Sequence, residues 1–132
     1  MALQKIFLVD DEPLMAEVVR RIIVDEGYTV EIAVDSREAL RAISADIRGY
    51  AVLVTDNNMP GLSGVELIRE LRRAGFSGKI IMFSGNVAPG EEPRIRATGA
   101  DLILRKPSEL KLLVPAIRNA FGHWGSPSDE GK

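Results

Sequence analysis

The sequence contains no cysteine and a single histidine, His123, among its 132 residues. Disulfide bonds, thiolate chemistry and cysteine metal sites are therefore excluded, and one histidine cannot form a histidine metal cluster. A bound metal must take oxygen ligands, which favours magnesium, calcium or manganese. Positive charge is not in excess either, because the formal net charge is −2 and the sequence pI is near 5.5. We therefore expect no direct binding of nucleic acid.

Long hydrophobic runs are also missing. No apolar stretch approaches the roughly 18 residues that a transmembrane helix needs, and the amino terminus lacks the pattern of a secretory signal. The length of the chain and its 45% hydrophobic content fit one globular domain with one core. We therefore expect a cytoplasmic domain without membrane contact.

Five short apolar runs, bounded by polar or turn-forming residues, predict five strands. The runs cover residues 5–9, 28–33, 51–55, 79–83 and 102–104. A helical pattern follows each run. The first helix begins at Pro13, which suits the first helical position, and it ends before Gly27. Its predicted inner stripe consists of Met15, Val18, Val19, Ile22 and Ile23.

The boundaries of the remaining helices are predicted from capping residues, glycine and prolines. Ser36 is the expected N-cap of the second helix, Gly64 begins the third, and prolines restrict the fourth to about residues 93–98. The last helix is predicted over residues 108–121, where Pro115 either kinks the helix or delays its start.

Buried strands that alternate with helices predict a doubly wound α/β domain. Its five parallel strands, in the order 2-1-3-4-5, carry five helices on the two faces of the sheet. Polar residues follow four of these strands: Asp10 and Asp11 the first, Asp56 the third, Ser84 the fourth and Lys106 the fifth. Because the carboxyl ends of parallel strands share one edge, we expect these side chains to converge between the first and third strands.

Three carboxylates in one crevice repel one another, at a cost on the order of 4 kcal/mol for each pair about 4 Å apart at an effective dielectric near 20. Lys106 supplies one compensating charge, and a hard divalent cation is the natural second. Magnesium favours carboxylates, waters and a phosphate oxygen as ligands. The cluster therefore indicates a magnesium and phosphoryl site built on a single acidic nucleophile.

Four motifs occur in this order: Asp10-Asp11, Asp56 with Met59-Pro60-Gly61 and Gly64, Ser84-Gly85, and Lys106-Pro107. Together they resemble the receiver domain of bacterial response regulators, over about residues 4–121. The resemblance implies a flavodoxin-like fold with a receiver domain at residues 1–121. Residues 122–132, rich in glycine, serine and charge, then form a flexible C-terminal tail.

The resemblance also implies a function. The chain is expected to be a phosphoacceptor switch of a two-component phosphorelay, phosphorylated by a sensor histidine kinase or a histidine phosphotransfer protein. It would act on a downstream partner protein that the sequence does not identify.

The same resemblance assigns roles to individual residues. Asp56 is implied to be the phosphoacceptor, and Lys106 to pair with the phosphoryl oxygens from a cis Lys106–Pro107 bond. The implied ligands of magnesium, or of manganese in its place, are Asp11, Asp56, the backbone carbonyl of Asn58 and, through a water, Asp10. Asn58 and Asn86 occupy positions that tune dephosphorylation in the family.

Other members of the family pattern hold or sense the phosphoryl group. Backbone contacts to its oxygens are implied for Asn57 and Gly85, and the Ser84 hydroxyl is implied to move and hydrogen-bond one oxygen. The family often has an aromatic side chain that rotates on activation three residues before the lysine. Ile103 stands at that switch position here, which puts the usual coupling to Ser84 in doubt.

Each motif alone has a simpler interpretation. Asp10 and Asp11 before Pro13 are typical of a helix N-cap, Asp56 of a turn, and Ser84 of an ordinary loop. The agreement of four strand ends at one edge favours the phosphoryl site instead.

Two other functions compete with the switch. One is a magnesium-dependent phosphatase with an aspartyl nucleophile, but such enzymes carry their nucleophile in a DxD motif after the first strand. The other is a scaffold that binds partners without phosphorylation, which conflicts with the intact set of acids. As a switch, the protein would catalyse only its own phosphorylation and dephosphorylation, so we do not expect an enzyme that turns over a separate substrate.

Overall fold

Five strands form the sheet of the computed structural model, which describes residues 5–122. They are β1 (Lys5–Val9), β2 (Val30–Ala33), β3 (Tyr50–Thr55), β4 (Lys79–Ser84) and β5 (Leu102–Arg105). Their order is β2-β1-β3-β4-β5, and neighbouring strands are parallel throughout. The predicted order and orientation are therefore confirmed. The boundary that differs most is the start of β2, which was predicted at residue 28.

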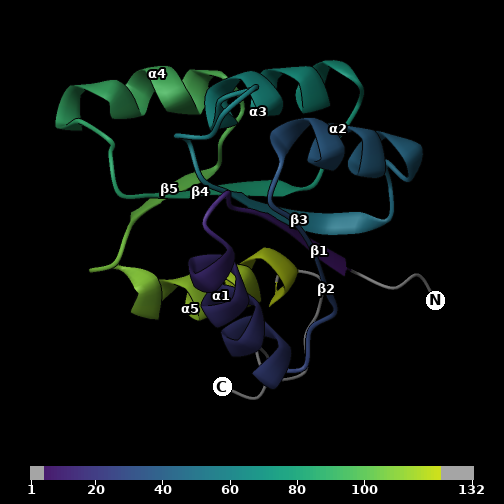
Figure 1. Cartoon of the computed structure of the whole chain (residues 1–132), viewed down its shortest axis with the longest axis vertical. Coiled ribbons are helices and arrows are strands. Elements are labelled where there is room, and N and C mark those ends of the chain that lie inside the picture. Colours follow the sequence, from purple (N-terminus) through teal and green to yellow (C-terminus); the bar gives the residue numbers. More distant parts are fainter. Residues whose placement is uncertain (1–4, 123–132) are drawn as a thin grey trace.

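Helices cover both faces of this sheet (Figure 1). One face carries α1 (Pro13–Asp25) and α5 (Leu113–Gly122), and the other carries α2 (Ser36–Ala45), α3 (Gly64–Arg73) and α4 (Glu92–Ala97). Two short 3₁₀ helices, η1 (Pro89–Glu91) and η2 (Leu110–Leu112), lead into α4 and α5. Across the described residues, the predicted doubly wound α/β architecture with five α-helices is confirmed.

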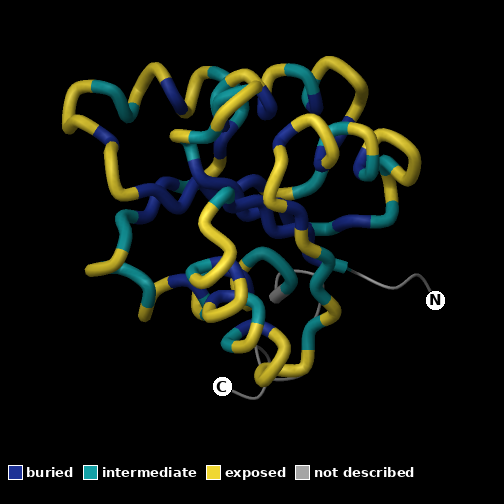
Figure 2. The backbone as a smooth tube through the Cα atoms, viewed as in Figure 1, coloured by how far each residue is buried: buried dark blue, intermediate teal, exposed yellow. Residues whose placement is uncertain are grey.

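Alternation along the strands gives the protein two apolar cores, one on each face of the sheet. Ile6 and Leu8 of β1 belong to the same buried cluster as Val19 and Ile23 of α1. Phe7, which points to the opposite face, belongs to the cluster that includes the inner sides of α2 and α3. The inner strands β1, β3 and β4 consequently lie buried between two layers (Figure 2), which explains their nearly continuous apolar sequence.

The register of the strands brings their carboxyl ends together. Val9 pairs with Ala33 of β2 and with Thr55 of β3. The N–H of Asp10 donates to the carbonyl of Ala33 at 3.2 Å, and the N–H of Asp56 donates to the carbonyl of Val9 at 3.0 Å. Asp10 and Asp56 therefore leave two neighbouring strands at the same edge of the sheet.

The start of α2 differs from the prediction. Asp35, rather than Ser36, is the N-cap, because its carboxylate accepts hydrogen bonds from the N–H groups of Arg37 and Glu38 at 2.7 and 3.3 Å. Ser36 is the first helical residue and is fully buried. Both residue types cap helices, and the two stand next to each other in the sequence.

Two further helix predictions need correction. α5 begins at Leu113 instead of residue 108, which confirms the alternative that Pro115 delays the start of the helix. Pro115 thus lies in the first turn, where proline removes no hydrogen bond of the helix. The buried stripe of α1 is narrower than predicted, since Val18 is 49% exposed while Val19 and Ile23 are fully buried.

Within residues 5–122, no helix has the length and apolar character needed to cross a membrane. The predicted tail, residues 122–132, lies outside the described residues except for Gly122, which ends α5. His123 is among the residues that the structure does not describe.

Candidate functional site

Three carboxylates meet at the carboxyl edge of the sheet. Asp10 and Asp11 follow β1, Asp56 follows β3, and each offers an oxygen that lies within 4.8 Å of the other two. Asp10 and Asp56 are only 2% and 8% exposed, whereas Asp11 is half-buried. Negative charges this close in a poorly hydrated place favour a compensating cation. The convergence predicted from the strand ends is therefore observed.

Lys106, directly after β5, supplies one positive charge to this cluster. Its ammonium donates to Asp10 at 2.6 Å and to Asp56 at 3.1 Å, and its side chain is 9% exposed. Burial acts to lower the pKa of Lys106, but the hydrogen bonds to the two aspartates and their negative charges together raise it above its ordinary value. One protonated lysine therefore holds the two buried acids together. The Lys106–Pro107 peptide bond is cis, as the resemblance implied.

The backbone around Asp56 is fixed from several sides. The Thr55 hydroxyl donates to the carbonyl of Asp56 at 2.9 Å, and the N–H of Asn57 donates to the Asp56 carboxylate at 2.7 Å. The side-chain oxygen of Asn57 accepts a hydrogen bond from the N–H of Val65 at 3.1 Å, in the first turn of α3. Gly64 approaches so closely that a Cβ on it would lie 2.2 Å from the carbonyl oxygen of Asp56. This approach requires glycine at position 64.

The loop after β3 is tied to the two helices that flank it. The Ser36 hydroxyl donates to the carbonyl of Pro60 at 3.4 Å and accepts from the N–H of Leu62 at 3.0 Å. Ser63 and Glu66 form a capping box at the start of α3, with reciprocal hydrogen bonds of 2.9 and 3.1 Å. Our sequence interpretation missed both contacts, although the Ser-x-x-Glu spacing is a recognisable signal for the capping box.

A polar pocket of about 200 Å³ opens over the carboxylates. Its lining residues are Asp11, Glu12, Asp56, Asn58, Gly85, Asn86 and Lys106. The sequence had pointed to all of them as site residues except Glu12. The Glu12 side chain is 67% exposed, and its carboxylate lies 3.9 Å from the Lys106 ammonium. In the sequence, only the place of Glu12 directly after Asp10 and Asp11 indicated that it could belong to the site.

Two predicted switch residues lie behind the pocket and do not line it. Ser84, the last residue of β4, is fully buried, and its hydroxyl accepts a hydrogen bond from the N–H of Asn86 at 3.3 Å. Ile103 on β5 is buried in the core cluster that also contains Val87, after β4, and Ile95 of α4. Ser84 is therefore linked to the pocket through Asn86, and Ile103 is linked to the β4–α4 segment through apolar packing.

The donor atoms of the pocket suit a hard divalent cation. The three carboxylates offer oxygen ligands only, and magnesium binds one or two carboxylates while it keeps several waters and a phosphate oxygen. A pocket of about 200 Å³ has space for such waters, each of which takes about 30 Å³ in the liquid. The residues present therefore fit a magnesium ion.

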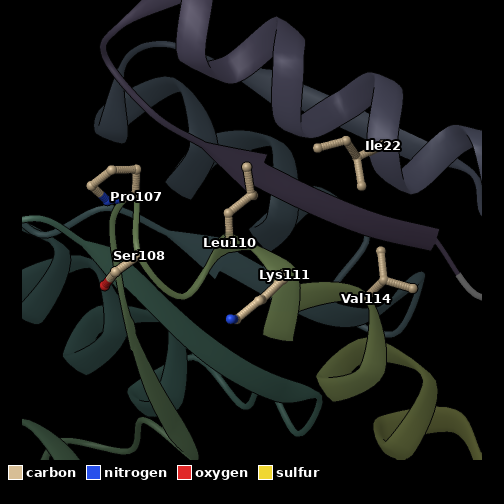
Figure 3. A pocket seen from close by; sticks show the side chains of 6 residues that line it. All are labelled: Ile22, Pro107, Ser108, Leu110, Lys111 and Val114. Carbon is tan, nitrogen blue, oxygen red and sulfur yellow. The ribbon is translucent and has the colours of Figure 1, made fainter.

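A second, mainly apolar groove of about 440 Å³ lies beside the acidic pocket, between α1 and the start of α5. It is lined by Ile22, Pro107, Ser108, Leu110, Lys111 and Val114. Figure 3 shows Leu110 and Val114 pointing toward the side of α1 that carries Ile22. Leu14 and Val18 extend the same stripe of α1 at four-residue spacing, and they are 84% and 49% exposed. Pro107, which lines this groove, directly follows Lys106, which lines the acidic pocket.

The fold and the site together define a class of protein. They describe a doubly wound α/β domain with an acidic pocket at the switch point of its sheet. The family model for the response regulator receiver domain matches residues 6–118, and the chain belongs to this family.

Similar proteins agree with this assignment. The response regulator MprA of Mycobacterium ulcerans is 37% identical over 126 residues, which cover 96% of this chain and 53% of that protein. The chain thus spans about half the length of the curated relatives it matches.

Solved structures are similar over nearly their whole length. A response regulator receiver domain protein from Clostridium thermocellum has a TM-score of 0.84 at 30% identity, covering 92% of this chain and 96% of that one. TrrA of Thermotoga maritima, solved in complex with Mg²⁺-BeF, has a TM-score of 0.78 at 26% identity, covering 89% of this chain and 99% of that one.

Proposed function

We propose that this receiver domain is a phosphoacceptor switch, in which Asp56 accepts a phosphoryl group from a histidine kinase or a histidine phosphotransfer protein. One observation carries the proposal. The Asp56 carboxylate ends a buried strand in a pocket with two further acids, while the Lys106 ammonium at 3.1 Å and the Asn57 N–H at 2.7 Å point at its oxygens. A carboxylate held by such donors is ready to act as a nucleophile toward phosphorus.

The proposed transfer is an in-line displacement at phosphorus. A carboxylate oxygen of Asp56 attacks the phosphorus of a phosphohistidine, the phosphorus–nitrogen bond breaks, and the imidazole leaves with the bonding electrons. The product is an aspartyl phosphate. Charge on the phosphoryl oxygens is balanced by the Lys106 ammonium and by the backbone N–H groups of Asn57 and Gly85.

A magnesium ion is part of the proposal, with manganese as a substitute. Its ligands would be Asp11, Asp56, the carbonyl of Asn58 and, through a water, Asp10. When bound, the ion neutralises the acids and polarises a phosphoryl oxygen. The oxygen-only donor set of the pocket supports this part, as does the Mg²⁺-BeF complex of the related TrrA.

Release of the signal is proposed to pass through the segment after β4. The Ser84 hydroxyl, now bonded to the Asn86 N–H, would turn to a phosphoryl oxygen and so draw that segment inward. Asn58 and Asn86 line the pocket, where their side chains can influence the water that hydrolyses the aspartyl phosphate. Ile103 contributes apolar packing at this point in place of a rotating aromatic ring.

The adduct itself provides the main test. Protein incubated with magnesium and acetyl phosphate should gain the mass of one phosphoryl group, as measured by intact-mass spectrometry. Asp56→Asn should remove the adduct completely, whereas Asp25→Asn, which changes an exposed acid at the other end of α1, should retain it. Rapid turnover of several phosphate esters would favour the phosphatase instead, and an unmodified protein even with a cognate kinase would refute the proposal.

We further propose that the protein donor docks on the apolar groove beside the pocket. Val18→Glu should slow transfer from a phosphorylated histidine protein at least about 10-fold, a loss of about 1.4 kcal/mol of transition-state binding, because it puts a charge on the apolar stripe. Val24→Glu is the matched control, since Val24 is similarly exposed but lies on another side of α1. Acetyl phosphate should modify both variants at the wild-type rate. Equal slowing by both substitutions would contradict the docking site.

A further inference from the structure

Glu12 is the one residue of the acidic pocket for which the proposed chemistry has no role. The N–H of Glu12 donates to the Asp10 carboxylate at 3.0 Å, so its backbone is held against the buried acid. Its side chain makes no capping hydrogen bond to α1, although it stands at the N-cap position. The carboxylate instead lines the pocket, 3.9 Å from the Lys106 ammonium.

The charges around the pocket are strongly unequal. Asp10, Asp11 and Asp56 form the group that can hold a metal, and Glu12 adds a fourth negative charge at the rim. Among residues 5–122, Lys106 is the cation that contacts this set, and it already donates to Asp10 and Asp56. A phosphoryl donor that enters the pocket therefore meets the negative charge of Glu12, which is not among the proposed metal ligands and accepts no hydrogen bond from Lys106.

We infer that Glu12 determines which phosphoryl donors react, by disfavouring donors and leaving groups with added negative charge. The inference rests on the proposed phosphoacceptor function of Asp56. It favours donors with a phosphorus–nitrogen bond, whose nitrogen leaves in neutral form, over acyl phosphates, which enter as dianions and release a carboxylate.

Both reactions can be written in full. With acetyl phosphate, an Asp56 oxygen attacks phosphorus, the phosphorus–oxygen bond breaks, and acetate leaves as an anion. With phosphoramidate, the same attack breaks the phosphorus–nitrogen bond, and the protonated nitrogen leaves as neutral ammonia. Glu12 repels the more negative donor on entry and disfavours the anion formed beside it, so both effects act in the same direction.

The test compares the two donors at saturating magnesium. In Glu12→Gln, which keeps the shape of the side chain, the ratio of the acetyl phosphate to the phosphoramidate rate constant should rise about 3- to 10-fold, as expected for one unit of charge at several ångströms near a surface. Asp25→Asn removes a charge from the far end of α1, roughly 18 Å along the helix, and should change the ratio less than about two-fold.

Ionic strength gives an independent measurement on the unmodified protein. Added salt screens an exposed charge such as Glu12, so the wild-type ratio should rise toward the value of Glu12→Gln, and that variant should respond less. An unchanged ratio in Glu12→Gln, with adduct still formed on Asp56, would overturn this inference alone. Absence of adduct with either donor in every variant would overturn the proposed function and this inference with it.

Discussion

A lysine lies between two acids at each edge of the sheet, but the two clusters differ in burial. At the carboxyl edge, Lys106 joins Asp10 and Asp56, and all three side chains are at most 9% exposed. At the amino edge, Lys5 lies 3.1 Å from Glu31 and 3.7 Å from Asp46, whose side chains are 44% and 56% exposed. Water screens the second cluster and hardly reaches the first.

The clusters also differ in how their acids are satisfied. At the amino edge, the Glu31 carboxylate accepts a hydrogen bond from the Tyr50 hydroxyl at 2.6 Å in addition to the one from Lys5, so one of its two donors is neutral. At the carboxyl edge, Asp11 and Glu12 instead add negative charge around the ammonium of Lys106. Both clusters contain ion pairs, so an ion pair by itself does not indicate a functional site. The excess of negative charge around Lys106 is the feature that favours a cation or a phosphoryl group at the carboxyl edge.

The largest expected effect comes from removing the buried ammonium. Lys106→Met should lower the free energy of unfolding by about 3–5 kcal/mol at neutral pH without metal, because Asp10 and Asp56 keep their charges with no cation between them. Urea denaturation followed by circular dichroism measures the loss. Because its pKa is raised in the folded state, the stabilisation by Lys106 is complete at neutral pH and is lost only as pH rises through that raised pKa.

Lys5→Met is the matched substitution at the amino edge. Lys5→Met should reduce the free energy of unfolding much less than Lys106→Met does, because Glu31 and Asp46 are partly exposed to water. Equal losses in the two variants would contradict the distinction between the edges.

A smaller effect is expected from magnesium. At about 100 times its dissociation constant, the ion should raise the free energy of unfolding by about 2.7 kcal/mol, as thermal denaturation with magnesium or with a chelator would measure. Asp11→Asn should lose most of this gain, whereas Glu31→Gln at the amino edge should keep it. A gain that survives Asp11→Asn undiminished would place the ion elsewhere.

The smallest effect concerns Tyr50. Burial, followed by the hydrogen bond to Glu31 and its negative charge, raises the pKa of Tyr50 to about 12. The folded protein then keeps a proton that the unfolded chain loses near pH 10, so this contribution to stability declines between about pH 10 and pH 12. Tyr50→Phe should cost about 1 kcal/mol at neutral pH, and its deficit should shrink above pH 10. A deficit that is constant with pH would show that Tyr50 is not responsible for the decline.

Much of the fold could be predicted because its signals are local. The five apolar runs and the helical patterns between them predict parallel strands in a doubly wound sheet, and the strand order then follows from the order that such five-stranded folds commonly have. The cluster of Asp10, Asp56 and Lys106 followed from the sheet, since parallel strands carry their carboxyl ends to one edge. Predictions failed where two neighbouring residues suit the same local role and only tertiary contacts decide which of them takes it. Asp35 caps α2 because the hydroxyl of Ser36 is used by the loop after β3.

Contacts between distant segments were less accessible from the sequence. The position of the Glu12 carboxylate at the rim depends on the conformation of an exposed side chain at the start of α1, and no sequence spacing encodes that conformation. The exposure of Val18 likewise depends on how α1 lies against the sheet. The apolar face of an amphipathic helix can be wider than the part that packs against the sheet, and Val18 lies at the uncovered margin of that face. The roles proposed for the pocket residues remain predictions that the experiments above address.

The close approach of Gly64 to Asp56 has a mechanical consequence for this domain. On the α3 side, the backbone of residue 64 leaves no space for even a methyl group beside the Asp56 carbonyl, and the loop between them is tied by hydrogen bonds. On the β4 side, residues 85, 86 and 88 are exposed. If Asp56 becomes bulkier, as the proposed function requires, we therefore expect the backbone to move away from α3 and toward α4. The response to phosphorylation would then have a direction, set by the close approach of Gly64.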